Sequence, residues 1–419
     1  MAFLLALVNT CKSVFGTGLL AMPFAFVTLQ NLPFGCALCV LLGMWSCYTM
    51  LLIYKSTLLA WPMKSAAGYS ALAQAALGDT GRILCSSNLV VHQLFAVATY
   101  LVFISDSLRD VFGGQKSVYT LSCVLPLLIL CWLRDVRAIG PASAIGTGAL
   151  AITLCLVLHE GCSDFAAIEM PSAAPSAPRP TLSALATFAG IAIFTFAGHD
   201  SVVPVVLSLD ANEPKHAPYD WVVLCLTIVA IPGVLGFSAT AAACFDQHAT
   251  KNILLAVHGS LAAVLKVLMA TAIFFTCPIK LFPAFEICEG ALGLAHVMPA
   301  EDQLVLPDST VGRNASEVTR HVYLRNALRS VLVAIAATVA IACPDFEFLV
   351  AFIGAFCNSL ISFVLPPVMY CMLLHSTGRL TERPGQILSF LLHALLAVMG
   401  VCVFLGSTYK VVGDKLLGE

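Results

Sequence analysis

The stretch NTCKSVFGTGLLAMP, from Asn9 to Pro23, decides how this sequence is interpreted. It lies inside an apolar run from Ala2 to about Val27, and about 20 apolar residues are enough to cross a bilayer. The middle of the run nevertheless contains Lys12, two glycines and a proline, which a simple anchor helix does not need. A charge at mid-membrane costs roughly 2.5–3.5 kcal/mol. Clustered Gly and Pro in a spanning segment are typical of an interrupted helix that lines a buried site.

The composition indicates a membrane protein along the whole chain. Of the 419 residues, 59% are hydrophobic and 11% are charged, whereas soluble domains contain about 25% charged residues. The net charge of −2 provides no basic surface, so nucleic acid is excluded as a partner. The 17 cysteines are mostly scattered within apolar runs and form no paired zinc motif. We therefore expect no metal site and no cofactor.

Hydrophobic runs bounded by charge, Pro or Gly predict an all-α polytopic protein with eleven membrane spans. These runs lie near 3–28, 33–57, 82–112, 117–133, 138–159, 182–208, 217–245, 257–285, 322–343, 346–375 and 385–411. Lys and Arg are more frequent in the connections that would be cytoplasmic if the N-terminus is inside. The positive-inside rule thus predicts a cytoplasmic N-terminus.

The sixth span repeats the pattern of the first. It reads FTFAGHDSVVP from Phe194 to Pro204, again with a Gly in mid-span and a Pro soon after. Spans one and six are equivalent if the chain consists of two five-span halves and an extra helix, and such a pair marks the substrate site of an inverted-repeat transporter. We expect one transmembrane domain over 1–412, with repeats at about 1–159 and 181–375 and the extra helix at about 385–411. The alternative is two kinked packing helices.

Six stretches together resemble the amino acid/auxin permease family, most closely its proton-coupled amino acid transporter branch. They are KSVFGTGLLAMPFAF from Lys12, YLVFISDSLRDVF from Tyr100, LPLLILCWLRDVRAIGPAS from Leu125, GIAIFTFAGHDSVVP from Gly190, AIFFTCPIKLFP from Ala272 and the segment from Leu328 to Pro367. The resemblance implies a five-plus-five inverted-repeat fold with broken helices 1 and 6, working by alternating access. In that branch span six reads Phe-x-Phe-Glu-Gly, whereas here Ala197 replaces the Glu and His199 and Asp200 follow.

A free amino acid carries a carboxylate and an ammonium group, and a broken helix offers partners for both. The unpaired N–H groups at the start of a half-helix bind carboxylate, and the freed carbonyls before the break accept from ammonium. Glycine lets the ligand approach the backbone closely. The predicted substrate-binding residues are Ser13, Gly16, Thr17, Gly18, Tyr100, Thr195, Phe196, Ala197 and Gly198. For the rings of Phe196 and Tyr100, ordinary packing is the alternative.

Four residues are candidates for ion coupling. Lys12 lies one turn before Gly16, and its ammonium could replace a metal cation or exchange a proton, which favours proton coupling or uniport over sodium coupling. Its alternative role is to reach the inner interface. His199 is the natural proton switch near neutral pH, and Asp200 beside it could bind a proton, but both could instead lie in a water-filled vestibule. Thr276 stands where a sodium-coupled relative would offer a hydroxyl, or it only packs.

These observations predict a secondary active transporter of small neutral amino acids rather than an enzyme, because motifs such as H-E-x-x-H and G-x-S-x-G are missing. Its partners would be an amino acid, H+ and the lipid bilayer. The membrane would be the plasma membrane or a vacuolar or lysosomal type of organelle membrane. The alternatives are sodium-coupled transport, uniport, and a permease-like receptor that senses an amino acid.

Overall fold

A computed structural model describes residues 7, 10, 16–60, 68–132, 140–165, 179–209, 218–245, 252–294, 315–378 and 384–417. Within these ranges all regular structure is helical, and no strand is present. This is expected for apolar segments in a membrane, because a helix pairs its own backbone polar groups where no water can do so.

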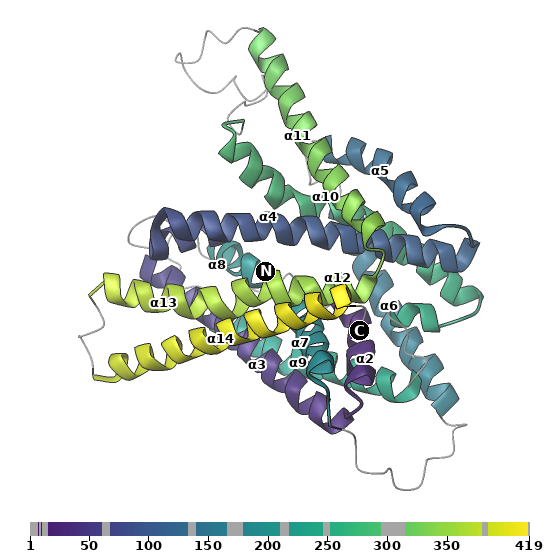
Figure 1. The fold of residues 1–419 in the computed structure, drawn as a ribbon, viewed down its shortest axis with the longest axis horizontal. Coiled ribbons are helices and arrows are strands. Elements are labelled where there is room, and N and C mark those ends of the chain that lie inside the picture. The colour runs from purple at the N-terminus through teal and green to yellow at the C-terminus, as the bar shows by residue number, and fades with distance from the viewer. Residues whose placement is uncertain are drawn as a thin grey trace. The chain divides into compact units, whose positions relative to one another are not determined.

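The helices follow the predicted spans closely (Figure 1). They are α2 (Thr17–Leu29), α3 (Leu32–Ala60), α4 (Tyr69–Phe112), α5 (Lys116–Trp132), α6 (Gly140–Phe165), α7 (Leu182–Thr195), α8 (Val202–Leu209), α9 (Tyr219–Phe245), α10 (Ser260–Ala291), α11 (Ala315–Ala342), α12 (Phe346–Phe352), α13 (Leu365–Ser376) and α14 (Pro384–Leu417). Over the described residues, 8 helical segments are long and apolar enough to cross a membrane, and Thr17–Leu29, Lys116–Trp132 and Gly148–Gly161 are shorter apolar helices. The predicted polytopic helical fold is confirmed.

Two boundaries differ from the sequence prediction. The third span was predicted over 82–112, whereas helix α4 already begins at Tyr69 and runs into that span through a kink at Gly78. Gly78 has φ 69°, a left-handed conformation that favours glycine. Helix α10 also continues to Ala291, beyond the predicted end at 285, because its amphipathic last turns carry Glu286 and Glu289 without ending the helix.

The chain divides into two compact units. Unit 1 contains residues 1–88, 147–265 and 345–419, and unit 2 contains 89–146 and 266–344. Unit 2 thus combines the third and fourth spans with the eighth and ninth. The division into repeats at 1–159 and 181–375, with an extra helix at 385–411, stays a prediction.

The core of unit 1 contains two helices whose backbones touch. A Cβ atom added at Gly354 would lie 1.7 Å from the carbonyl oxygen of Gly190 in α7. Gly354 belongs to a π-helical segment, Ile353–Asn358, which a second one, Leu360–Val364, follows before α13. Small residues allow this approach in a membrane, where helices associate by packing rather than by the hydrophobic effect. Helix α14 lies beside α13 (Figure 1).

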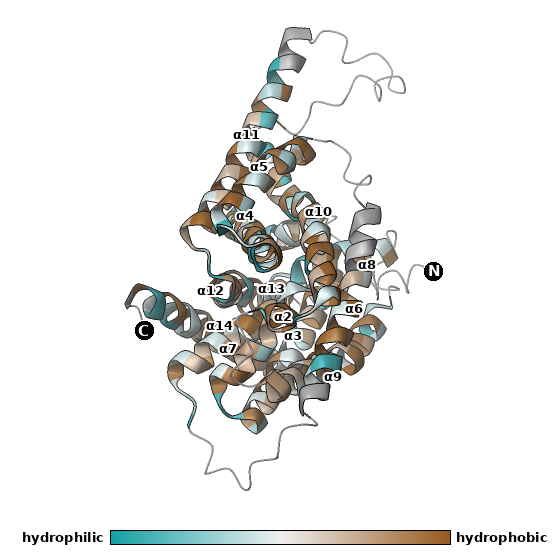
Figure 2. Cartoon of the chain, turned by 90° about the vertical axis from the view of Figure 1, so that its right-hand side faces the viewer, coloured by the Kyte–Doolittle hydropathy of each residue, from teal (hydrophilic) through white to brown (hydrophobic). Residues whose placement is uncertain are grey.

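Hydrophobic residues predominate along many helices (Figure 2), and a number of them are exposed. On α14 they include Ile387, Leu388 and Leu391, which are 54%, 61% and 58% exposed, and on α9 Trp221 and Ile228 are both 63% exposed. Soluble monomeric proteins rarely expose apolar surface of this extent to water. Faces of this kind suit contact with lipid tails rather than with water.

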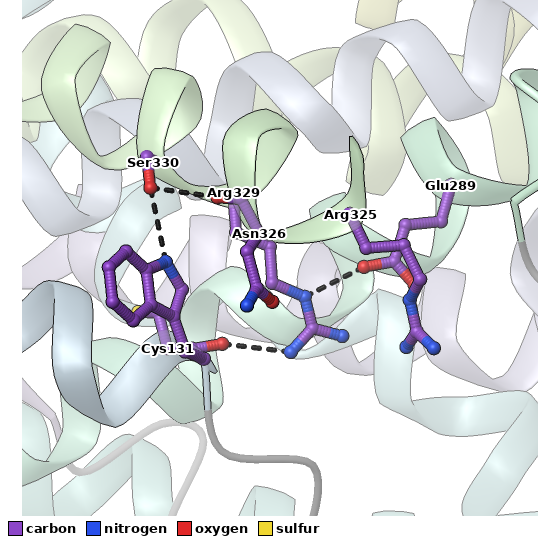
Figure 3. A network of polar contacts seen from close by, with 7 residues as sticks. Cys131, Glu289, Arg325, Asn326, Arg329 and Ser330 are labelled. Atoms are coloured by element: carbon purple, nitrogen blue, oxygen red, sulfur yellow. Dashed lines mark hydrogen bonds and ion pairs between the residues drawn. The ribbon is translucent and has the colours of Figure 1, made fainter. Parts of the chain in front are cut away.

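Unit 2 contains a buried charge network (Figure 3). Glu289 of α10 accepts from Nε of Arg329 at 2.7 Å and from Nε of Arg325 at 3.1 Å, both on α11. Arg329 also donates to the carbonyl of Cys131 in α5 at 2.8 Å. A second pair joins Lys266 to Asp110 at 2.6 Å. An oppositely charged partner offsets the cost of removing each of these charges from water.

Candidate functional site

The sixth span is interrupted, as predicted. Helix α7 ends at Thr195, and a 3-10 turn, His199–Ser201, precedes α8. Phe196, Ala197 and Gly198 lie between the two helical parts. The amide of Phe196 still bonds to the carbonyl of Ala192 at 2.9 Å, but the regular ladder stops there. Backbone N–H and C=O groups in the middle of the span therefore lose their helical partners. At membrane depth such groups occur only where the protein buries them or where they line a cavity.

The described helix of the first span, α2, begins beside this interruption. Gly16 is the N-cap of α2 with φ −123°, an extended conformation. It has no side chain with which to cap the first N–H groups of α2. Two residues later, a Cβ added at Gly18 would lie 2.7 Å from Thr195 Oγ1. The start of α2 and the end of α7 are therefore in direct contact.

Helix α3 supplies a hydrogen bond to the backbone of the interrupted segment. Ser46 Oγ donates to the carbonyl of Phe196 at 2.8 Å, and Ser46 is only 2% exposed. On the other side of the interruption, Ser201 Oγ donates to the carbonyl of Gly198 at 2.7 Å. The first of these bonds ties the interruption to a neighbouring helix, so the geometry of the broken span depends on α3.

His199 connects three segments of unit 1. Its Nε2 lies 2.9 Å from Thr49 Oγ1 and 3.2 Å from the Ser46 carbonyl, both on α3. Its Nδ1 lies 2.8 Å from the hydroxyl of Ser362 in the second π-helical segment. A carbonyl can only accept, so we assign the hydrogen to Nε2, and Nδ1 then accepts from Ser362. The side chain is 1% exposed and is a fully paired neutral imidazole in this arrangement.

The structure brings several of the predicted residues together. Gly18, which follows Gly16 and Thr17 in the chain, contacts Thr195, and Thr195 directly precedes Phe196, Ala197 and Gly198. The ring of Phe196 is buried, and its Cζ would lie 3.1 Å from a Cβ added at Gly43 of α3, so at least this edge of the ring packs against a helix. Asp200 is half-buried beside His199. The substrate role of this group stays a prediction.

The remaining predicted residues are Tyr100, Thr276, Lys12 and Ser13. Tyr100 on α4 and Thr276 on α10 belong to unit 2, where Tyr100 is 8% exposed and Thr276 Oγ1 donates to the carbonyl of Ala272 at 2.9 Å. Lys12 and Ser13 lie outside the described residues. No statement about the surroundings of these two side chains follows from the structure.

Sequence reasoning missed three polar residues. Ser46, Thr49 and Ser362 bind the interrupted span, yet none was singled out. Ser46 and Thr49 are spaced three residues apart in an apolar helix, which places both on one face. Two hydroxyl groups on one face in the middle of an apolar span could have predicted a polar contact with another span. Among the described residues no group of His, Cys, Asp or Glu side chains could hold a metal ion.

Comparison with known proteins identifies the family. The family model for transmembrane amino acid transporter proteins matches residues 2–412. The chain belongs to this family. The match confirms the family to which the sequence was compared, and it places the chain among multi-pass membrane transporters rather than enzymes.

Individual members of the transmembrane amino acid transporter family are distant. Amino acid transporter ANT1 of Arabidopsis thaliana is 25% identical over 404 residues, which cover 94% of this chain and 89% of the relative. Vacuolar amino acid transporter 3 of Saccharomyces cerevisiae is 24% identical over 421 residues, covering 96% of this chain and 55% of the relative. A solved structure of a Na+-coupled sialic acid symporter aligns with 98% of this chain and 95% of its own at 13% identity and a TM-score of 0.49. A likeness this weak carries no argument about the chain.

Proposed function

We propose that the protein is a secondary active transporter that carries small neutral amino acids together with protons. Membership of the transmembrane amino acid transporter family supports amino acid transport, and two relatives with vacuolar names favour a vacuolar type of membrane over the plasma membrane. Three further parts of the proposal depend on the chemistry of the interrupted spans: the class of amino acid, coupling to protons, and alternating access.

One observation carries the assignment of the substrate site. The uncapped start of α2 at Gly16 lies next to the interruption of the sixth span, through the contact of Gly18 with Thr195. A Cβ added at Gly16 would meet no atom within 4 Å, so the space directly beside this backbone position is open. The first N–H groups of α2 suit a carboxylate, and carbonyls of the interruption suit an ammonium group. A zwitterion of amino acid size matches this pairing.

The substrate side chain would meet few charges here. Thr17 is 8% exposed and Thr195 is 2% exposed, and both are neutral. A charged side chain would need a buried counter-ion to offset its desolvation. This favours small neutral amino acids.

The proposed proton acceptor is Nδ1 of His199. When this atom binds a proton, both ring nitrogens become donors, and Ser362 must accept rather than donate. Protonation thereby changes the contact between the 3-10 turn and the π-helical segment. A turn that lies directly after the substrate-binding interruption is well placed to couple the two events. Lys12 and Asp200 are the alternative coupling groups, and Thr276 would serve only a sodium-coupled mechanism.

Uptake into proteoliposomes tests this proposal. Purified protein is reconstituted, and uptake of labelled alanine is measured under an imposed pH gradient without sodium and under a sodium gradient at equal pH, with the membrane potential clamped. We expect stimulation by the pH gradient alone. Stimulation only by sodium would overturn proton coupling, and uptake indifferent to both gradients would indicate uniport. Saturable binding without any uptake would indicate a receptor.

A further inference from the structure

A polar cavity lies in unit 2. It measures about 410 Å³ and is lined by Arg109, Gly114, Gln115, Lys116, Ser117, Thr120, Ala340, Ile341 and Pro344. These residues come from the end of α4, the start of α5 and the end of α11. Because all three helices end or begin here, the cavity lies where apolar spans meet the headgroup region.

The lining has a positive charge and no carboxylate. Arg109 and Lys116 both line the cavity, together with one amide and two hydroxyl side chains. Lys116 pairs with Asp106, and Lys266 nearby pairs with Asp110. The guanidinium of Arg109 has no ion pair among the described residues, and its side chain is exposed. The cluster therefore retains one uncompensated positive charge beside the cavity.

The connection that forms the rim is fixed in place. Gly113 and Gly114 have φ 74° and 85°, so the turn between α4 and α5 uses two successive left-handed residues that favour glycine. Tyr119 Oη donates to the carbonyl of Gly113 at 2.8 Å, and the amide of Gly113 bonds to the carbonyl of Arg109 at 2.8 Å. A fixed turn holds Arg109 and Lys116 at constant separation, which lowers the entropic cost of binding a ligand.

The opposite wall of the cavity is apolar and continues onto a lipid-facing surface. Ala340, Ile341 and Pro344 form it, and Ile341 is 41% exposed. On α5, Val118 and Leu121 are both 58% exposed next to the polar rim. A ligand with an anionic group and an acyl chain could contact both walls. Its anionic group would bind the cations, and its acyl chain would lie along the exposed apolar side chains.

We propose that this cavity binds the headgroup of a phospholipid with net negative charge, with Arg109 as the main contact of its phosphate and Lys116 shared between that phosphate and Asp106. Basic residues at the membrane surface attract anionic lipid in this way, and a pocket between helices adds selectivity to the general attraction. The proposal does not depend on proton coupling or on the substrate site.

Native mass spectrometry of the full chain in detergent provides the test. Phosphatidylglycerol and phosphatidylcholine are added in turn, and the bound lipid is counted. We expect wild-type protein to retain phosphatidylglycerol preferentially and Arg109→Gln to bind it about fivefold more weakly. Arg109→Lys should keep most of the preference. Arg320→Gln is the matched control, since Arg320 is an exposed cation near the opposite end of α11.

Two further outcomes are decisive. If inorganic phosphate displaces phosphatidylglycerol at similar concentrations and depends equally on Arg109, the site takes a soluble anion, and the lipid assignment is overturned. If wild-type protein shows no preference for phosphatidylglycerol, or if Arg109→Gln and Arg320→Gln weaken it equally, the cavity is not an anion site. Equal melting temperatures of the variants exclude misfolding as the cause.

Discussion

The hydroxyl of Ser362 lies 2.8 Å from Nδ1 of His199, and this bond joins the interrupted sixth span to the π-helical part of the tenth. Because the other ring nitrogen contacts α3, a single side chain holds three segments together. Protonation of Nδ1 would turn it from an acceptor into a donor toward Ser362.

Replacing Ser362 by Ala leaves a buried acceptor without its donor. A loss of this kind costs about 1–3 kcal/mol, so we expect a lower melting temperature and a weaker response of uptake to the pH gradient. Ser376→Ala is the control, because Ser376 is exposed near the end of the same span. Thermal unfolding in detergent and proteoliposome uptake measure the two effects. Identical behaviour of both variants would show that the bond contributes nothing.

Adding a methyl group at Gly18 tests the contact between the two broken spans. The new Cβ would lie 2.7 Å from Thr195 Oγ1 and 3.0 Å from Thr195 Cα, which forces α2 and α7 apart. Overpacking costs roughly 1–3 kcal/mol, and we expect Gly18→Ala to lose most uptake. Gly236→Ala on α9 is the matched control, since its Cβ would meet nothing within 4 Å. Normal uptake by Gly18→Ala would mean that the spans do not meet here.

The backbone contact between Gly354 and Gly190 in unit 1 leads to a stronger prediction. A Cβ at Gly354 would lie 1.7 Å from a main-chain oxygen, which no side-chain rotation relieves. We expect Gly354→Ala to yield little folded protein, as judged by size-exclusion chromatography. Gly406→Ala on α14, with nothing within 4 Å of its Cβ, should behave like wild type. Equal yields for the two variants would refute this helix contact.

Removing Glu289 tests the charge network of unit 2. The side chains of Glu289 and Arg329 are 6% and 5% exposed, so Glu289→Gln leaves Arg329 buried without this carboxylate, at a cost of about 3–5 kcal/mol. The control is Asp345→Asn, which breaks a pair with Lys415, a side chain that is 43% exposed, and should cost about 1 kcal/mol or less. Asn can still cap α12 at that position. Similar melting temperatures of the two variants would contradict the network's role.

Most of the fold could be predicted because hydrophobic length and the positions of Gly and Pro are visible in a single sequence. The interruption near Gly198 was predicted from its Gly and Pro pattern. The π-helical segments from Ile353 to Val364 were not, because the apolar pattern of the tenth span does not distinguish a π-helix from an α-helix. The bonds of His199 were missed for a related reason: its partners lie 150 and 163 residues away along the chain.

Binding by Gly16→Ala is the most direct test of the substrate site. The extended backbone of Gly16 accepts Ala, and the new Cβ would meet no atom within 4 Å, so the fold should be unchanged. If the amino acid carboxylate binds at the start of α2, the methyl group obstructs it. We predict a wild-type melting temperature and a fall of at least about tenfold in the affinity for labelled alanine, measured by scintillation proximity, with Gly236→Ala unaffected. Wild-type affinity in a correctly folded Gly16→Ala variant would contradict the site.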